Sequence, residues 1–449
     1  MNDSKKFSSS RLGRLGKLGK SLAVATGHLA LDVVKNKTQE IIEKNPKAQE
    51  ITRRALAAKE IVQSMGELKG AMMKIGQMIS ITEDLVLPPE ISALFKELQK
   101  SAPPMPRADL ESVFMTCFQK SPEQIFKEFN YTPMAAASIG QVHYAKTFEG
   151  EEVAVKIQYP KIVEAIQNDF KNLDRINQLI TLLVPGRPNI ENYVQELRRS
   201  LLEECDYLKE IEHMDKFREL YSSQCPNLIV PKVYKELSNR SILTMELMQG
   251  DSFEETQNYS QEEKDQLGQI LFDAHIYGIY SARYLHTDPQ NGNYLFKKGK
   301  IILLDFGSIR SFDEEFIQLY VELLKSIEDN QLEDYRRIML ALGFFEPTDD
   351  QELFENHFKM IKKLYLPYTQ PGMRSIIKLN PFELIQDFMK GVSIKGRKAP
   401  REEFLLLDRA NLGLYSKLKS WGSVIDWTTL RNKCWEPYLI NIKNSSRNF

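Results

Sequence analysis

The sequence is poor in cysteine and lacks any paired cysteine motif. Its 449 residues include four cysteines, which lie far apart and form no C-x-x-C pair. These are Cys117, Cys205, Cys225 and Cys434. The pattern is typical of reduced thiols in an intracellular protein, and it provides no spacing suited to a zinc site.

Excess charge and long apolar runs are also missing. Sixty basic side chains stand against 61 acidic ones, so overall electrostatics gives no reason to expect nucleic acid as a partner. Apolar stretches such as Ile180–Val184 and Ile301–Leu304 are far shorter than the run of about 18 residues that spans a bilayer. We therefore expect no transmembrane segment.

Residues 1–30 are strongly basic, with Asp3 as their single acid. Leucines recur there at three- and four-residue spacing, which would give a helix an apolar stripe beside a cationic face. They are Leu12, Leu15, Leu18 and Leu22. The segment fits a flexible basic tail, a helix on an anionic membrane surface or an organelle transit peptide, and the sequence leaves these three open.

The rest of the chain divides into three expected regions. Residues 31–130 show three- and four-residue apolar spacing and predict a helical extension. Residues 131–248 begin with short strands and predict a small antiparallel-sheet lobe that also contains long helices. Residues 249–449 predict a large, mostly helical lobe, so the fold class is α+β with two lobes and an N-terminal extension. The elements expected in the small lobe are the strands Tyr131–Ile139, Gln141–Thr147 and Val153–Gln158 and the helices Ile162–Val184 and Asn192–Leu220.

Three motifs supply the parts that phosphoryl transfer requires, namely metal ligands, a cation on the phosphates and a positioned carboxylate. Lys156 ends the sequence V-A-V-K, the form of a strand-borne lysine that holds the α- and β-phosphates. His286, Asp288 and Asn293 fit H-x-D-x-x-x-x-N, which predicts a loop oriented by the histidine, a catalytic aspartate and a magnesium-binding asparagine. Asp305 opens D-F-G and is expected to hold the metal between the β- and γ-phosphates. The joint order and spacing predict a kinase-like ATP site.

The expected phosphate loop departs from that of protein kinases. Residues Ala135–Val142 align with G-x-G-x-x-G-x-V and keep its last glycine and valine, but they carry alanine at the first two glycine positions. Alanine removes the freedom to adopt positive φ and adds a methyl group where backbone approaches phosphate. We therefore expect a stiffer loop that holds the nucleotide differently. The loop residues expected at the nucleotide are Ala135, Ala136, Ala137, Ser138, Gly140 and Val142.

This alanine-rich loop resembles that of the UbiB/ADCK (AarF) family of atypical kinases. Lys74-Ile75-Gly76-Gln77 is similar to the K-x-G-Q signature of that family, and Glu204-Cys205-Asp206 resembles its E-x-D motif. The resemblance implies a protein-kinase-like fold in which Lys74 and Gln77 reach back over the nucleotide site. Glu204 and Asp206 are then expected to meet Lys74.

The resemblance also assigns the partners of the phosphate-binding lysine and of adenine. Glu210 is the expected αC glutamate that pairs with Lys156, and Asp206 and Glu210 are expected on one helical face. The long separation between Lys156 and Glu210 implies a helical insert over residues 160–195 of the small lobe. The expected hinge is Met245–Gln249, which is expected to contact adenine through backbone groups of Glu246 and Met248.

Two further departures concern the acceptor. Thr287 replaces the arginine of H-R-D, and the chain is expected to become helical again at Glu314–Ile327, without a long activation segment or an A-P-E motif. Peptide docking and phosphorylation-dependent switching therefore lack their usual apparatus.

The resemblance implies an enzyme that binds ATP and Mg²⁺ and supports isoprenoid-quinone biosynthesis or lipid homeostasis at a membrane surface. Its expected partners are a lipid or quinone-precursor molecule and a quinone-biosynthesis complex. Its expected location is cytoplasmic or peripheral to a membrane, and mitochondrial in a eukaryote. Two alternatives stay open: a protein kinase that acts in trans, and a nucleotide-gated scaffold without significant turnover.

Overall fold

The computed structural model describes residues 105–137, 139–171, 198–199, 201–380, 383–384 and 402–445. Several features expected from the sequence lie outside these residues. They are the basic segment 1–30, the extension up to residue 104, Lys74 and Gln77, Ser138, and residues 172–197 of the expected insert.

The small lobe is built on one five-stranded antiparallel sheet, in which β1, β3, β4 and β6 are neighbours and β2 pairs with β3. The strands are β1 Glu128–Phe129, β2 Ala135–Ala136, β3 Gly140–Lys146, β4 Glu152–Gln158 and β6 Ile242–Glu246. Strand β4 lies in the middle and is buried on both faces. Its odd-numbered residues Val153, Val155 and Ile157 belong to one apolar cluster and Ala154 to another, because successive side chains of a strand point to opposite faces. Lys156 therefore points to the same face as Ala154.

The first strand expected from the sequence, Tyr131–Ile139, is interrupted in the structure. The side chain of Asn130 accepts a hydrogen bond from the amide of Thr132 (2.9 Å), which makes a local turn. Pro133 follows and has no N–H to donate to a ladder. Within the expected segment only Ala135–Ala136 form a strand, β2, and β1 ends before the segment begins. The second and third expected strands are confirmed as β3 and β4.

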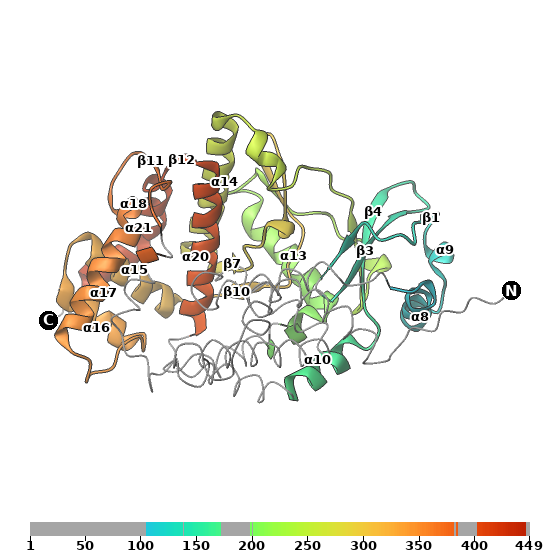
Figure 1. Ribbon diagram of the computed structural model, residues 1–449, viewed down its shortest axis with the longest axis horizontal. Helices are drawn as coiled ribbons and strands as arrows, with labels where there is room; N and C mark the ends of the chain where they lie inside the picture. The colour runs from blue at the N-terminus through green and yellow to red at the C-terminus, as the bar shows by residue number, and fades with distance from the viewer. Residues whose placement is uncertain are drawn as a thin grey trace, which may run out of the picture.

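Two short helices cover the outer face of this sheet. Helix α8, Arg107–Phe118, packs on β4, and helix α9, Pro122–Ile125, packs on β1; Figure 1 shows both beside the strands at one end of the molecule. Leu110 and Phe114 of α8 are buried with the odd-numbered residues of β4. Residues 105–130 thus pack as one unit with the sheet.

The expected helix Asn192–Leu220 is broken within its described part. Residues 201–204 are helical, and α13 begins afresh at Tyr207 and ends at Tyr221. Asp206 is the N-cap of α13 and accepts a hydrogen bond from the amide of Leu208 (3.2 Å), which satisfies a helix-end donor. Helix α10, Ile162–Lys171, is the described start of the insert.

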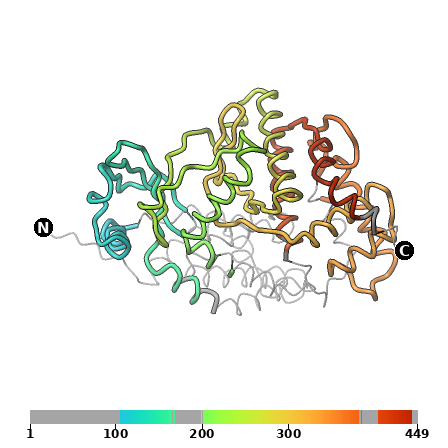
Figure 2. The backbone as a smooth tube through the Cα atoms, turned by 180° about the vertical axis from the view of Figure 1, so that it is seen from behind, coloured from blue at the N-terminus to red at the C-terminus, as the bar shows by residue number. Residues whose placement is uncertain are grey.

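The large lobe packs around helix α14, Gln261–Tyr280, which contacts α20, α21 and strand β7. Figure 1 shows α14 and α20 side by side, and Figure 2, from behind, shows α13 between the strand-rich end and this helical end. The other α-helices among its described residues are α15 Glu314–Glu328, α16 Leu332–Ala341, α17 Gln351–Leu364, α18 Leu366–Thr369, α20 Glu402–Trp421 and α21 Thr429–Ser445. Its strands are β5 Leu228–Ile229, β7 Tyr284–His286, β8 Tyr294–Lys297, β9 Lys300–Leu303, β10 Ile309–Ser311, β11 Met373–Ser375 and β12 Val424–Asp426.

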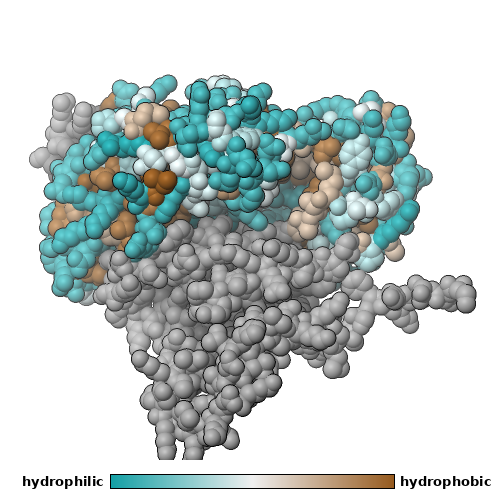
Figure 3. Space-filling model, turned by 45° about the horizontal axis from the view of Figure 1, so that its top comes forward, coloured by the Kyte–Doolittle hydropathy of each residue, from teal (hydrophilic) through white to brown (hydrophobic). Residues whose placement is uncertain are grey.

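Short strands of the large lobe hold the loops that carry the motifs. Strands β8 and β9 form a hairpin, β5 adds to β9 in parallel, and β10 pairs with β7. The chain then runs from β10 into α15, which confirms the absence of a long activation segment. On the face seen in Figure 3, hydrophilic residues predominate and apolar ones form small groups. Among the described residues, no helix combines the length and apolar character of a membrane span.

Candidate functional site

Lys156, Glu210 and Asp305 meet between the two lobes. The Lys156 Nζ on β4 lies 2.9 Å from Oε1 of Glu210 on α13 and 2.8 Å from Oδ2 of Asp305. Lys156 and Glu210 are buried, while about a quarter of the Asp305 side chain (26%) is exposed. The pairing of Lys156 with Glu210 that the resemblance implied is present in the structure.

Burial and charge pairing act in opposite directions on the pKa of each group in this cluster. Burial favours the neutral amine of Lys156, but the carboxylates of Asp305 and Glu210 outweigh it and raise the pKa of Lys156 well above its usual value. For Glu210, burial raises the pKa to about 7, although the ammonium group of Lys156 opposes this shift. Lys156 is therefore a fixed cation in the site.

The D-F-G segment is held against α13. The amide of Phe306 donates to Oε1 of Glu210 (3.2 Å), and its ring packs edge-on against Phe217 of α13 with 5.4 Å between centroids. The amide of Gly307 donates to Oδ1 of Asp305 (2.9 Å). Phe306 is fully buried against α13. The neighbouring Asp305 carboxylate is directed toward Lys156.

The loop after β7 is tied to D-F-G by backbone and side-chain contacts. His286 Nε2 lies 2.7 Å from the Asp305 carbonyl oxygen, in agreement with its expected orienting role. Thr287, which stands where H-R-D has arginine, donates from its amide (2.9 Å) and its hydroxyl (3.0 Å) to the carbonyl of Ser308. Thr287 thus fastens the segment after D-F-G directly to the loop.

Asn293 and Asn291, which stand two positions apart, point to different surroundings. The Asn293 side chain donates a hydrogen bond to the backbone carbonyl of Asp288 (3.4 Å). The backbone carbonyl of Asn293 accepts a hydrogen bond from the amide of Leu304, the residue before Asp305 (2.9 Å). The side chain of Asn291 instead reaches toward Glu254 (3.5 Å). The geometry therefore favours Asn293 as the asparagine of the candidate metal site.

These residues suit magnesium and a nucleotide. A carboxylate from Asp305 and an amide oxygen from Asn293 are hard oxygen ligands, and Mg²⁺ takes its remaining ligands from phosphates and water. In the described part of the chain, no group of three or more histidine, cysteine or acidic side chains forms a metal site of its own. A metal held by Asp305 and Asn293 would take its remaining ligands from nucleotide phosphates and water.

The alanine loop adopts strand structure at its start. Ala135 pairs with Val142 and Ala136 with Gln141 across β2 and β3, and Ala137 donates to the Gly140 carbonyl (2.9 Å). Val142 in turn lies opposite Lys156 in the β3–β4 ladder. The loop is therefore positioned above the lysine.

Gly140 is required by close packing of backbones. A Cβ at this position would lie 2.1 Å from the carbonyl oxygen of Ile157 on β4, far inside van der Waals contact. The retained glycine of the loop thus allows β3 and β4 to approach each other.

The expected hinge follows the end of β6. The Glu246 amide donates to the carbonyl of Lys232 (2.8 Å) and the Leu247 amide to that of Glu152 (3.1 Å). Among the described residues, no group accepts a hydrogen bond from the Met248 amide. Met248 is therefore a candidate donor at the expected hinge.

The two acids of the E-x-D motif have different environments. Glu204 is buried beside D-F-G, since a Cβ at Gly307 would lie 2.8 Å from its Cγ. Asp206 caps α13 and pairs with Arg240 (3.3 Å). Asp206 is thus the cap of the helix, and its carbonyl accepts a hydrogen bond from the Glu210 amide (3.4 Å). The expectation that the two acidic side chains share a helical face stays a prediction. The expected contact with Lys74 lies outside the described residues.

Sequence reasoning missed two residues that contact the catalytic loop from the far C-terminal part of the chain. Arg409 Nη2 lies 2.8 Å from Oδ1 of Asp288, and Lys417 Nζ donates to the carbonyl of Pro289. Both lie on α20, together with Gly413. The only local signal was this glycine inside a helical pattern, since such glycines often have a packing reason.

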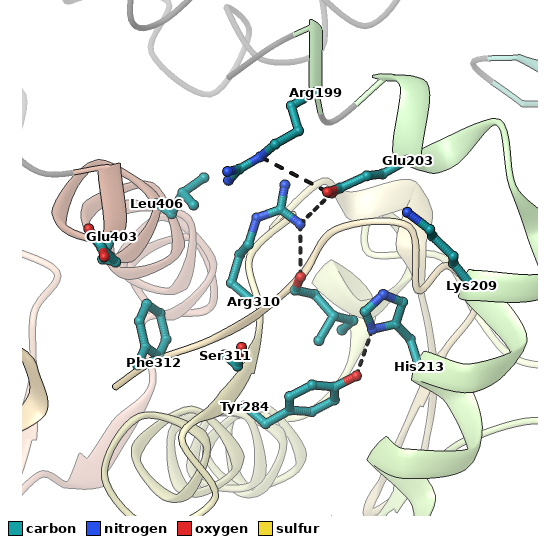
Figure 4. Close-up of a pocket in the computed structure, with 11 residues that line it drawn as sticks. Arg199, Glu203, Lys209, His213, Tyr284, Arg310, Ser311, Phe312, Glu403 and Leu406 are labelled. Atoms are coloured by element: carbon teal, nitrogen blue, oxygen red, sulfur yellow. Dashed lines mark hydrogen bonds and ion pairs between the residues drawn. The ribbon is translucent and has the colours of Figure 1, made fainter. Parts of the chain in front are cut away.

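A separate cavity of about 440 Å³ lies between α13, the β7–β10 pair and the start of α20 (Figure 4). Arg310 on β10 pairs across it with Glu203 (2.9 Å), and His213 on α13 lies 2.6 Å from the Tyr284 hydroxyl. Burial lowers the pKa of His213, and the nearby Arg310 adds to the effect. Neither the D-F-G aspartate nor Lys156 lines this cavity, so it is distinct from the candidate nucleotide site.

Comparison with known proteins places this geometry in a family. Residues 97–339 match the model of the ABC1 atypical kinase-like domain. The chain is 33% identical over 392 residues to the probable serine/threonine-protein kinase abkA of Dictyostelium discoideum, covering 81% of this chain and 68% of that protein. It is 30% identical over 413 residues to the mitochondrial atypical kinase COQ8B of Rattus norvegicus, covering 92% of this chain and 78% of that protein.

A solved structure supports the same placement. The Mycobacterium tuberculosis protein Rv3197, solved in complex with erythromycin, is 25% identical and superposes with a TM-score of 0.57 over 86% of this chain and 97% of its own. The expected α+β, kinase-like fold is thus confirmed. The chain belongs to the ABC1 family of atypical kinases, which confirms the UbiB/ADCK resemblance of its motifs.

Proposed function

We propose that this chain binds Mg-ATP and transfers the γ-phosphoryl group of ATP to an acceptor molecule or to water. The observation that carries the proposal is the convergence of Lys156, Glu210 and Asp305 within hydrogen-bond distance from three separate parts of the chain. A lysine fixed by a helix glutamate beside a D-F-G aspartate is the arrangement that kinases use to hold phosphates and metal. The proposed role is therefore that of an atypical kinase or ATPase.

Each proposed role follows from the position of the residue. Lys156 binds the α- and β-phosphates, with Glu210 as its support. Asp305 and Asn293 hold Mg²⁺, which neutralises charge on the β- and γ-phosphates when bound. The exposure of Asp305 supports its role as a metal ligand. Its Oδ2 contacts Lys156, and about a quarter of the side chain (26%) is accessible to a ligand.

The remaining nucleotide contacts come from backbone groups. The Met248 amide, with the Glu246 carbonyl, is proposed to bind adenine at the hinge. The loop residues Ala135–Val142 are proposed to cover the phosphates, with alanine methyl groups narrowing the space that glycine would leave.

The acceptor is proposed to be water or a small molecule. Thr287 anchors Ser308, which follows D-F-G, to the catalytic loop, and the chain enters α15 soon afterwards, so little backbone is available to dock a peptide. Asp288 is 1% exposed, which favours a small acceptor over the side chain of a docked peptide. By the UbiB/ADCK resemblance, we propose a lipid or quinone precursor as the ligand, at a peripheral membrane surface and within a quinone-biosynthesis complex.

Two alternatives remain within this proposal. The name of the Dictyostelium relative supports a protein kinase that acts in trans, and a nucleotide-gated scaffold would also use the same binding residues. The rat relative is named mitochondrial, which supports a mitochondrial location in a eukaryotic source.

The test is ATP hydrolysis by the purified full chain with Mg²⁺, with and without anionic liposomes and quinone-precursor phenols. Asp305→Asn is the blank. Turnover above the blank that rises with liposomes or phenols supports the proposal. Turnover equal to the blank under all conditions, with nucleotide still bound, would support the scaffold, and phosphate on an added protein would support the protein kinase.

A further inference from the structure

Helix α20 presents three residues at four-residue intervals to the loop that follows β7. Arg409, Gly413 and Lys417 share one face of the helix, because residues four apart lie one above the other. Arg409 contacts the side chain of Asp288, and both Gly413 and Lys417 contact Pro289. The contact is thus continuous along about two turns of the helix.

The ion pair between Arg409 and Asp288 is buried. Arg409 Nη2 lies 2.8 Å from Asp288 Oδ1, and the two side chains are 9% and 2% exposed. Removing one partner of such a pair leaves the other charge buried and uncompensated. The orientation of the Asp288 carboxylate therefore depends on α20.

Gly413 and Lys417 fix the backbone next to that carboxylate. A Cβ at position 413 would lie 2.0 Å from Cβ of Pro289, so only glycine lets helix and loop approach this closely. Lys417 donates to the Pro289 carbonyl and lies 4.7 Å from the centre of the Tyr294 ring. Lys417 is 3% exposed, so this hydrogen bond lies in an environment from which water is excluded.

We infer that α20 positions the catalytic loop for phosphoryl transfer, with Arg409 and Lys417 as positioning residues for Asp288. The inference rests on the proposed function for its catalytic meaning. The contact with Arg409 holds the buried Asp288 carboxylate in one orientation. Arg409 lies 121 positions after Asp288, so the geometry of the site depends on the C-terminal part of the large lobe.

The test compares Arg409→Leu, Arg409→Lys and Lys417→Met with Lys419→Met in the full chain. Lys419 lies on the same helix and makes none of these loop contacts, so its variant is the matched control. We expect Arg409→Leu to lower kcat for ATP hydrolysis about 10- to 100-fold, as a misplacement of about 1 Å can do. The KM for Mg-ATP should stay within about twofold, because Arg409 does not meet the nucleotide, and Arg409→Lys should retain part of the rate.

A second readout does not depend on turnover. Amide hydrogen exchange over residues 286–296 should become faster in Arg409→Leu and in Lys417→Met, and stay unchanged in Lys419→Met. Unchanged exchange in both loop-contact variants would overturn the inference even if the wild type hydrolyses ATP. A lack of turnover in the wild type would overturn the proposed function. Loss of protection of the loop in the variants of that protein would still support the role of α20 in positioning the loop.

Gly413 offers a test by steric rescue if the arginine variants fail to fold. Gly413→Ala should displace the loop and lower kcat, and Pro289→Gly removes the two carbon atoms that the new methyl group would strike. We expect Gly413→Ala to be much less harmful in the Pro289→Gly background than in the wild type. Equal losses in both backgrounds would contradict a direct contact between α20 and the catalytic loop.

Discussion

Lys156 Nζ on β4 lies 2.8 Å from Oδ2 of Asp305, a residue 149 positions later in the chain. The contact joins the sheet of the small lobe to the D-F-G segment of the large lobe. It also gives Asp305 two proposed tasks, to hold Lys156 and to bind Mg²⁺, which can be separated by mutation.

Asp305→Asn should abolish the stabilisation that Mg-ATP gives to the protein. The amide keeps the size of the side chain but removes an anionic metal ligand. A ligand that binds the native state raises the melting temperature, so the wild type should melt at higher temperature with Mg-ATP and the variant should not. ATP with EDTA is the control, and a wild-type shift in the variant would contradict the assignment of Asp305.

Lys156→Met should destabilise the fold more than Glu210→Gln does. Loss of the lysine leaves the carboxylates of Glu210 and Asp305 close together, whereas loss of the glutamate leaves Lys156 paired with Asp305. Breaking a buried pair costs about 3–5 kcal/mol, and urea denaturation measures it. The double variant should lose less than the sum of the two single variants, and additivity would argue against coupling.

The cost of Lys156→Met should depend on pH. The pKa of Glu210 is raised to about 7 by burial even with the lysine present, so the folded state binds this proton more tightly than the unfolded state. Raising the pH through 7 then lowers the free energy of unfolding. Lys156 lowers this pKa, so in Lys156→Met the pKa of Glu210 rises further and the loss of stability continues to higher pH than in the wild type. The deficit of Lys156→Met should therefore be larger at pH 8 than at pH 6, and Glu210→Gln in the same background should remove the difference.

Gly140→Ala should weaken the small lobe. The added Cβ would lie 2.1 Å from the Ile157 carbonyl oxygen, so β3 and β4 must separate, at a cost of about 1–3 kcal/mol. Gly292→Ala is a suitable control, because the nearest atom to its Cβ would be 4.0 Å away. Equal urea midpoints for the two variants would contradict the close approach of the strands.

Lys417→Met should remove a pH dependence of stability between pH 7 and 9. Burial lowers the pKa of Lys417 to about 7, against the opposing charges of Asp288 and Glu254. The unfolded chain, with a lysine pKa near about 10.4, binds this proton more tightly over that range. Stability therefore rises with pH, and the wild type should gain about 2 kcal/mol more than the variant between pH 7 and 9. Lys419→Met should behave like the wild type.

Local sequence determined the parts of the site that depend on short spacing. The V-A-V-K, H-x-D-x-x-x-x-N and D-F-G motifs each fix their residues within a few positions, and the strands β3 and β4 followed from alternating apolar residues. The break between β1 and β2 was missed because the turn depends on one side-chain hydrogen bond from Asn130, which weighs little in a pattern of apolar residues. The start of α13 was missed for a similar reason, since Asp206 acts as a helix cap there.

Tertiary structure alone decided which distant groups meet. The sequence by itself determined that Lys156, Asp288, Asn293 and Asp305 are present in kinase order, because these identities and spacings are local. It carried no signal that Arg409 would pair with Asp288, since a salt bridge across 121 residues depends on how α20 packs against α14. Only the folded chain brings these charges into a buried environment, where low dielectric makes the position of each partner decisive.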